Sequence, residues 1–276
     1  MAKHPAEVFG YPVWLDTAEA RASRKRQYCP FNNKECDKKS RLIKYSMGVC
    51  SVQFGKNVIA LSPNRFLQNN IVFHDIADHY FKDRSNLMVF REVGLKGIGN
   101  FDFIMLKHKP LSSEIEDFIA IEFQTGQTTS TGNLVNALKN FMSGKDVNGK
   151  TYNFGLNMAD IWKRTFTQIL NKGIVMENWQ HEIYWVIQEP VYQNFLDSYN
   201  LNGMGYNEGH STKFAIYDLQ LKDEKYELFK TRMESSTIDN LFHAFRNNPN
   251  IPSKSVFINR LETKIQKSAH LQLNFQ

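Results

Sequence analysis

The chain has 276 residues and a net charge of +6, and this whole excess lies in residues 1–60, which hold 11 basic and 5 acidic side chains. Residues 61–276 hold 23 of each sign, so the asymmetry indicates a polyanionic partner for the N-terminal part. An apolar content of 42% excludes a mainly disordered chain and suits one large domain, or a domain with a small appendage. Apolar runs reach only about five residues, against roughly 20 for a membrane span, and no signal peptide is evident, so we expect a cytoplasmic protein without membrane segments.

Capping signals, breaks and apolar periodicity divide the chain into predicted elements. Before residue 81 they predict a helix over 16–26, which a capping box from Asp16 to Glu19 begins, then a hairpin at 52–54 and 58–61 and helical structure over 63–80. The middle predicts strands at 86–93, 101–106, 117–124 and 182–188, with helices over 134–142 and 157–170. The remainder predicts helices over 191–199, 237–246 and 256–269 and strands at 213–221 and 225–230. This pattern is that of a mixed α/β domain.

The three cysteines are too few for a disulfide scaffold, yet Cys29, Cys36 and Cys50 lie within 22 residues inside the basic region. Cationic neighbours lower the pKa of a thiol, and thiolates are ligands for structural metal sites. A tetrahedral site takes four ligands and only three cysteines are present. The alternative is that they are small core residues.

A second constellation consists of Asp102 and the sequence Glu122-Phe-Gln124. Residues two apart in a strand point to the same face, so Glu122 and Gln124 should project together, with Asp102 on a neighbouring strand. Facing carboxylates are costly unless a cation neutralises them, and Mg²⁺ prefers such oxygen ligands. This layout is typical of metal-dependent phosphodiesterases. The alternative is ordinary acidic residues at strand edges.

Eight segments in a fixed order carry a resemblance that composition does not supply. They read EVFGYP at 7–12, CPF at 29–31, GVCS at 48–51, PNRF at 63–66, FIAIEFQ at 118–124, QTTSTG at 127–132, WK at 162–163 and WVIQ at 185–188. Together they resemble the NotI family of type II restriction endonucleases, over roughly residues 5–190. The last third of the chain contributes little to the resemblance.

The resemblance implies a PD-(D/E)xK nuclease core, a mixed sheet flanked by helices, with a small N-terminal iron-binding module. In that family glutamine replaces the usual catalytic lysine, which matches Gln124. Asp102 and Glu122 would then hold the catalytic Mg²⁺, with Gln124 orienting the attacking water and Glu92 as a helper carboxylate. We expect residues 1–70 to form the basic N-terminal module and residues 71–276 to form the catalytic domain.

Cys29, Cys36 and Cys50 match three metal-ligand positions of the family, for a structural iron or zinc. Where a fourth cysteine is expected, before Pro63, this sequence has Ser62, whose hydroxyl is a poor ligand beside three thiolates. Either a histidine such as His4 completes the set, or the site binds metal weakly or not at all.

The expected partner is double-stranded DNA, cut at a short specific sequence. Basic side chains of the N-terminal module and one lysine of the 157–170 helix are the predicted phosphate contacts: Arg21, Arg24, Lys25, Arg26, Lys38, Lys39, Arg41 and Lys163. A palindromic site favours a two-fold homodimer. Two alternatives stay open, a structure-specific or non-specific defence or repair nuclease and a metal-containing DNA-binding protein without catalysis.

Overall fold

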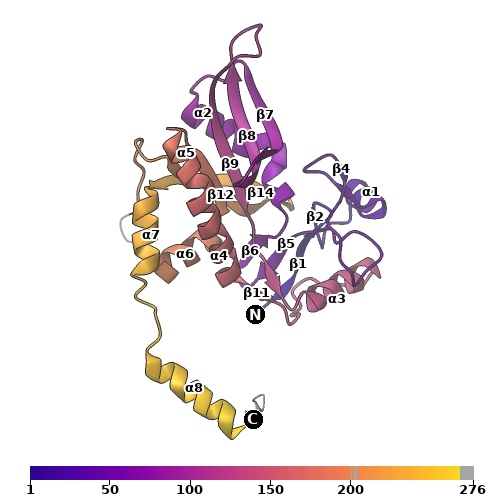
Figure 1. Ribbon diagram of the computed structural model, residues 1–276. Coiled ribbons are helices and arrows are strands. Elements are labelled where there is room, and N and C mark those ends of the chain that lie inside the picture. Colours follow the sequence, from indigo (N-terminus) through magenta and orange to yellow (C-terminus); the bar gives the residue numbers. More distant parts are fainter. Residues whose placement is uncertain (200, 202–203, 268–276) are drawn as a thin grey trace.

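A six-stranded mixed sheet forms the centre of the protein. The computed structural model describes residues 1–199, 201 and 204–267 (Figure 1). In sheet order the strands are β14 (Lys225–Ser236), β13 (Thr212–Lys222), β12 (Ile183–Gln188), β9 (Ile115–Gln124), β8 (Gly99–His108) and β7 (Leu87–Leu95). β9, β12 and β13 are parallel, and the other neighbours are antiparallel. The predicted mixed α/β class is confirmed.

Helices cover both faces of this sheet. One face carries α4 (Met158–Gln168), the π-helical turn η2 (Ile169–Gly173), α5 (Ile174–Asn178), α6 (Glu189–Tyr199) and α7 (Ile238–Arg246). The other carries the 3-10 segment η1 (Pro63–Asn70) and α2 (Ile71–Tyr80). β12 is buried along its whole length, and its alternate residues Trp185 and Tyr184 enter opposite cores. Burial on both faces explains its continuous apolar sequence.

The N-terminal part forms a second sheet, which we call the N-terminal sheet. Its order is β2 (Tyr11–Pro12), β1 (Lys3–Val8), β5 (Val49–Phe54) and β6 (Asn57–Ala60). Beyond it lie α1 (Ala18–Arg26) and the short pair β3 (Tyr28–Cys29) and β4 (Lys34–Glu35). The predicted hairpin is confirmed by β5 and β6, which pair around Gly55.

A later segment of the chain packs on the N-terminal sheet. It contains β10 (Thr128–Thr129), α3 (Thr131–Met142) and β11 (Gly155–Leu156). The backbone N–H of Lys3 donates to Lys150 O at 3.0 Å, and that of Tyr152 donates to Lys3 O at 2.8 Å. Val52 of β5 and Leu134 of α3 belong to the same hydrophobic cluster as Trp162. The division at residue 70 stays a prediction, and contacts of this kind join its two parts.

The first helix begins one residue later than the capping box predicts. Thr17, not Asp16, is the N-cap residue, and its hydroxyl accepts a hydrogen bond from the backbone N–H of Ala20 at 3.3 Å. Asp16 instead accepts from the Arg21 guanidinium at 2.9 Å. Threonine and aspartate both cap helices well, so the sequence alone did not decide between neighbours.

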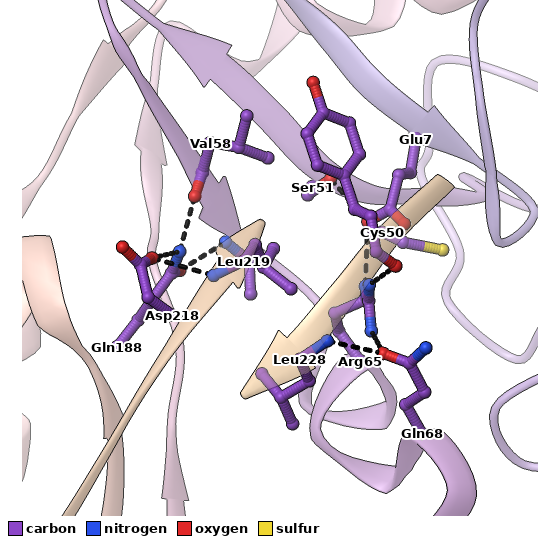
Figure 2. Close-up of polar contacts among 12 residues, drawn as sticks. Glu7, Cys50, Ser51, Val58, Arg65, Gln68, Gln188, Asp218, Leu219 and Leu228 are labelled. Carbon is purple, nitrogen blue, oxygen red and sulfur yellow. Dashed lines mark hydrogen bonds and ion pairs between the residues drawn. The ribbon is translucent and has the colours of Figure 1, made fainter. Parts of the chain in front are cut away.

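A buried guanidinium joins the N-terminal sheet to the six-stranded sheet (Figure 2). Arg65 of η1 is fully buried and donates from Nε to Glu7 Oε2 of β1 at 2.9 Å and from Nη2 to Tyr226 O of β14 at 2.5 Å. Glu7 also accepts from the Ser51 hydroxyl at 2.7 Å. Arg65 also donates from Nη1 to Gln68 Oε1 at 2.7 Å. The pair is therefore both enclosed and hydrogen-bonded, as a buried charge pair requires.

A buried amide makes a second connection in the same region (Figure 2). Gln188, the last residue of β12, accepts from the backbone N–H of Ala60 in β6 at 2.8 Å. Its amide nitrogen donates to Val58 O of β6 at 2.5 Å and to Asp218 Oδ1 of β13 at 2.9 Å. The edge of the N-terminal sheet is thus tied to two central strands.

The last described helix, α8 (Lys254–Gln266), extends away from the rest of the chain and buries none of its residues (Figure 1). Its predicted range of 256–269 runs into residues 268 and 269, which lie outside the described part. Among the described residues, no helix combines the length and apolar character needed to cross a bilayer.

Candidate active site

Three antiparallel strands bring acidic side chains into one row. Phe103 of β8 pairs with Ile121 of β9, which sets Asp102 opposite Glu122. The backbone N–H of Asp102 donates to Glu122 Oε1 at 3.3 Å, and Asp102 Oδ2 accepts from the backbone N–H of Phe123 at 2.9 Å. The predicted placement of Asp102 on the strand next to Glu122 is confirmed.

Glu92 lies in the same row on the edge strand β7. Its neighbours Arg91 and Val93 pair with Phe103 and Phe101, so Glu92 is set opposite Asp102. Its φ of 52° is in the left-handed region, which a glutamate rarely adopts. Such strain persists where the surrounding structure enforces it, often at functional sites.

Gln124 is held by the helix that covers this face. Its Oε1 accepts from the Thr165 hydroxyl at 2.9 Å, and its Nε2 donates to Gln168 Oε1 at 2.9 Å. Both partners belong to α4. The amide nitrogen has two hydrogens, so this arrangement fixes the side chain and leaves a second hydrogen to donate.

Glu122 is in contact with a lysine that the sequence motifs did not predict. Lys172 lies in the π-helical turn η2, and its Nζ is 2.7 Å from Glu122 Oε1 and 2.8 Å from Oε2. The same ammonium donates to Asn100 O at 2.6 Å. The side chain of Lys172 is 7% exposed and that of Glu122 is 0% exposed. Because 50 residues separate the two, no local motif could have indicated this ion pair.

The environment of Glu122 disfavours its charge. Burial, and then the neighbouring charge of Asp102, raise its pKa to about 7, although the Lys172 ammonium acts in the opposite direction. The cluster holds two carboxyl groups and one ammonium group. A further cation beside it would favour the ionised form of the carboxyl groups.

We expect the metal-free protein to lose stability as the pH rises from about 5 to about 8. The folded-state pKa of Glu122 is about 7 against an ordinary value of 4.5. Between these values the folded state binds more protons than the unfolded state, so the free energy of unfolding falls with rising pH, by up to ~3 kcal/mol. Urea midpoints measured in EDTA across this range should show the loss, and Glu122→Gln should lack this component. The same pH dependence in both proteins would contradict the assignment.

A cleft of about 720 Å³ opens beside the row of carboxylates. Its lining includes acidic groups, basic groups and three amides: Asp37, Glu92, Asp102, Lys34, Lys38, Arg91, Arg164, Asn64, Gln124 and Gln168. A smaller cleft of about 370 Å³ shares Lys38, Thr125 and Arg164 with it and adds Lys39. Glu122 lies behind the lining, in the buried pair with Lys172. The four basic side chains suit a polyanion that passes over the carboxylates.

The loop after β9 leads into the sequence QTTSTG at 127–132, and it lies close to β6. The backbone N–H of Gly126 donates to Ala60 O at 2.8 Å. A Cβ at Gly126 would lie 2.7 Å from the Ile59 side chain and 3.1 Å from that same oxygen. Glycine therefore permits the close approach that places Thr125 on the cleft wall.

The predicted DNA-contact residues fall into two groups. Lys38 and Lys39 line the clefts, although the ammonium of Lys38 also donates to Leu61 O at 3.1 Å. The others lie elsewhere: Lys25, Arg26, Arg41 and Lys163 are exposed, Arg21 pairs with Asp16, and half-buried Arg24 donates to Pro12 O and lies over the Phe141 ring. Lys34, Arg91 and Arg164 line the main cleft and were missing from the predicted set. Arg164 directly follows Lys163 in the sequence. The rotation of α4 about its axis decides that Arg164, and not Lys163, lines the cleft.

The three cysteines are free thiols, of which Cys29 and Cys50 are buried. Burial raises the pKa of both thiols, and Cys36 acts on each in the same direction. Ser62 lies beside them, because its backbone N–H donates to Cys50 O at 3.1 Å. Among the described residues, no group of three or more His, Cys, Asp or Glu side chains is arranged to hold a metal ion. The cysteines as placed therefore do not make a complete metal site.

His4, one possible fourth ligand, makes other contacts in this arrangement. Its Nδ1 lies 2.8 Å from Pro5 O, and its Nε2 accepts from the backbone N–H of Gly149 at 3.1 Å. Both ring nitrogens are therefore engaged, and the ring is buried in β1. Burial lowers its pKa.

A mixed sheet flanked by helices, with paired carboxylates beside a basic cleft, is consistent with a nuclease-like fold. The family model described as "Restriction endonuclease NotI" matches residues 7–205. The chain therefore belongs to the NotI restriction endonuclease family, as its sequence motifs predicted. Membership implies DNA endonuclease activity, a hydrolase reaction. No curated protein matches the chain.

Proposed function

We propose that this protein is a type II restriction endonuclease, which hydrolyses phosphodiester bonds of double-stranded DNA at a short specific sequence and depends on Mg²⁺. The observation that carries the proposal is the pairing of Asp102 with Glu122 on adjacent strands, next to a basic cleft. Family membership supports the same reading.

Asp102 and Glu122 would hold the Mg²⁺. Two carboxylates fit this ion, because Mg²⁺ in enzymes of this kind commonly takes one or two protein carboxylates and fills its other positions with water and substrate phosphate. The raised pKa of Glu122 agrees with a site that accepts positive charge. When bound, the ion supplies charge stabilisation at the phosphate and lowers the pKa of an attacking water.

The remaining cleft residues would bind and orient. Gln124 has no charge to offer, so its role is to direct the attacking water with its second amide hydrogen, while Thr165 and Gln168 keep the amide in place. Glu92 is the helper carboxylate at the open edge. Arg91 and Arg164 would contact phosphates on either side of the scissile bond.

Several finer features belong to the proposal. A two-fold homodimer would match a palindromic site, and a cytoplasmic location would give access to DNA. A structural iron or zinc at Cys29, Cys36 and Cys50 also stays a prediction, supported by the match of these three cysteines to the ligand positions of the family. Elemental analysis of the purified protein, with Cys36→Ser as the comparison, tests that metal.

Digestion of a plasmid of known sequence tests the function directly. Incubation with Mg²⁺ should give discrete fragments, and mapping of their ends should show one short sequence at every cut. A smear instead of sharp bands would favour the non-specific or structure-specific nuclease. DNA retention without any Mg²⁺-dependent product would favour a non-catalytic DNA-binding protein.

We expect Arg164→Gln to weaken binding of all DNA sequences to a similar extent. Loss of one phosphate contact should reduce the slope of log K against log salt concentration by about 0.9. Filter binding or fluorescence anisotropy over a range of salt concentrations measures this slope. Lys145→Gln, at an exposed residue outside both clefts, is the control and should leave the slope unchanged. An unchanged slope for Arg164→Gln would place DNA elsewhere.

A further inference from the structure

Lys172 is in direct contact with Glu122, the residue that we assign to the metal. Its ammonium contacts both oxygens of Glu122, at 2.7 Å and 2.8 Å. It also donates to Asn100 O and lies 5.5 Å from the centre of the Phe101 ring. Because the side chains of the pair are 7% and 0% exposed, water does little to screen this interaction.

The lysine reaches this position through an irregular helix. Residues 169–173 form a π-helical turn directly after α4. Such turns insert an extra residue and often occur at functional sites. Ile169, Lys172 and Gly173 are all buried in it, so the turn directs a charged side chain into the sheet. Gln124, two residues after Glu122 in the motif, is neutral. The ammonium group beside Glu122 therefore belongs to Lys172 of η2 and not to the motif itself.

We propose that Lys172 is a positioning residue that acts as the counter-ion of Glu122 in the metal-free enzyme and competes with the divalent cation for the same carboxylate. This inference rests on the proposed function. Both Glu122 oxygens are engaged by the ammonium, and a divalent ion needs at least one of them. Two cations held within a few ångströms at a buried carboxylate repel each other strongly. The carboxylate therefore stays fixed before the metal arrives, at the cost of a weaker metal affinity.

Metal binding to the DNA-free protein tests the competition. Mn²⁺ takes the same oxygen ligands as Mg²⁺, and its free form gives an electron paramagnetic resonance signal, so titration with Mn²⁺ alone measures affinity. Lys172→Met should bind Mn²⁺ at least about tenfold more tightly than the wild type. Lys172→Arg keeps the charge and should stay close to the wild type. Lys145→Met, an exposed lysine elsewhere, is the matched control.

Equal or weaker Mn²⁺ binding by Lys172→Met would overturn the proposal, since a purely structural lysine gives no gain. If that variant does not fold without metal, Lys172→Gln replaces it, because a neutral amide can still donate to Glu122 and should also bind more tightly. Glu122→Gln separates the two levels of inference. If it binds Mn²⁺ like the wild type, the metal assignment in the proposed function is wrong. If Glu122→Gln does not bind Mn²⁺ and Lys172→Met binds it no more tightly than the wild type, the metal assignment stands and only the proposed role of Lys172 is wrong.

Discussion

Glu122→Gln should abolish Mg²⁺-dependent cleavage while DNA binding persists. The substitution keeps the size of the side chain and removes the charge that would hold the ion beside Asp102. Loss of several kcal/mol of transition-state stabilisation corresponds to a rate decrease of at least about a thousandfold. DNA binding should survive, because the basic side chains of the cleft are untouched. Single-turnover cleavage of a short duplex and anisotropy on the same duplex measure the two effects.

Glu116→Gln provides the matched control for that experiment. Glu116 lies on the same strand, β9, but is exposed and outside the cleft. It should cut at the wild-type rate. If Glu122→Gln also cuts at that rate, Glu122 is not part of the catalytic site. If both variants lose DNA binding, the fold rather than the chemistry was disturbed.

Arg65→Met should lower the free energy of unfolding by about 3–5 kcal/mol, the cost of leaving a buried partner charge unpaired. Glu7 would lose its ionic partner in a site that is 1% exposed. The Tyr226 carbonyl would lose a donor as well. Urea unfolding, followed by tryptophan fluorescence and by circular dichroism, measures the change.

Arg84→Met is the natural comparison for Arg65→Met. Arg84 also forms a two-point pair, with Asp78, but both side chains are more than half exposed. Exposed pairs contribute about 0–1 kcal/mol, so this variant should stay close to the wild type. A loss below about 1 kcal/mol for Arg65→Met would show that the buried pair is not what holds the two sheets together.

The elements of the fold could be predicted well because their signals are local. Period-two and continuous apolar runs predicted the six strands, and apolar periodicity predicted where helices occur. The choice between Asp16 and Thr17 as N-cap failed because adjacent residues with the same capping ability differ only in backbone conformation. The packing of α3 against β1 could not be predicted, since it depends on contacts between segments more than 100 residues apart.

In the candidate site, too, the residues linked by local signals could be predicted and those brought in by distant segments could not. Glu122 and Gln124 are linked by strand periodicity, and Asp102 follows from a neighbouring strand, so these three could be placed from the sequence. Lys172 and Arg164 reach the site from helices whose rotation the sequence does not determine. Arg24, which was predicted from its charge to contact DNA, packs on Phe141, and its DNA contact stays a prediction. Charge alone does not tell which way a side chain points.

The hydrogen bond from Arg65 to the Tyr226 carbonyl has a consequence for how the protein can be divided. The family match ends at residue 205, whereas β13 and β14 begin at Thr212 and Lys225. Those two strands complete the sheet, and they accept donors from Arg65 and Gln188. A fragment trimmed to the matched region would expose the flank of β12 and would remove the carbonyl that accepts from Arg65 Nη2. The unit suited to expression, chimaeras or domain exchange therefore extends through β14.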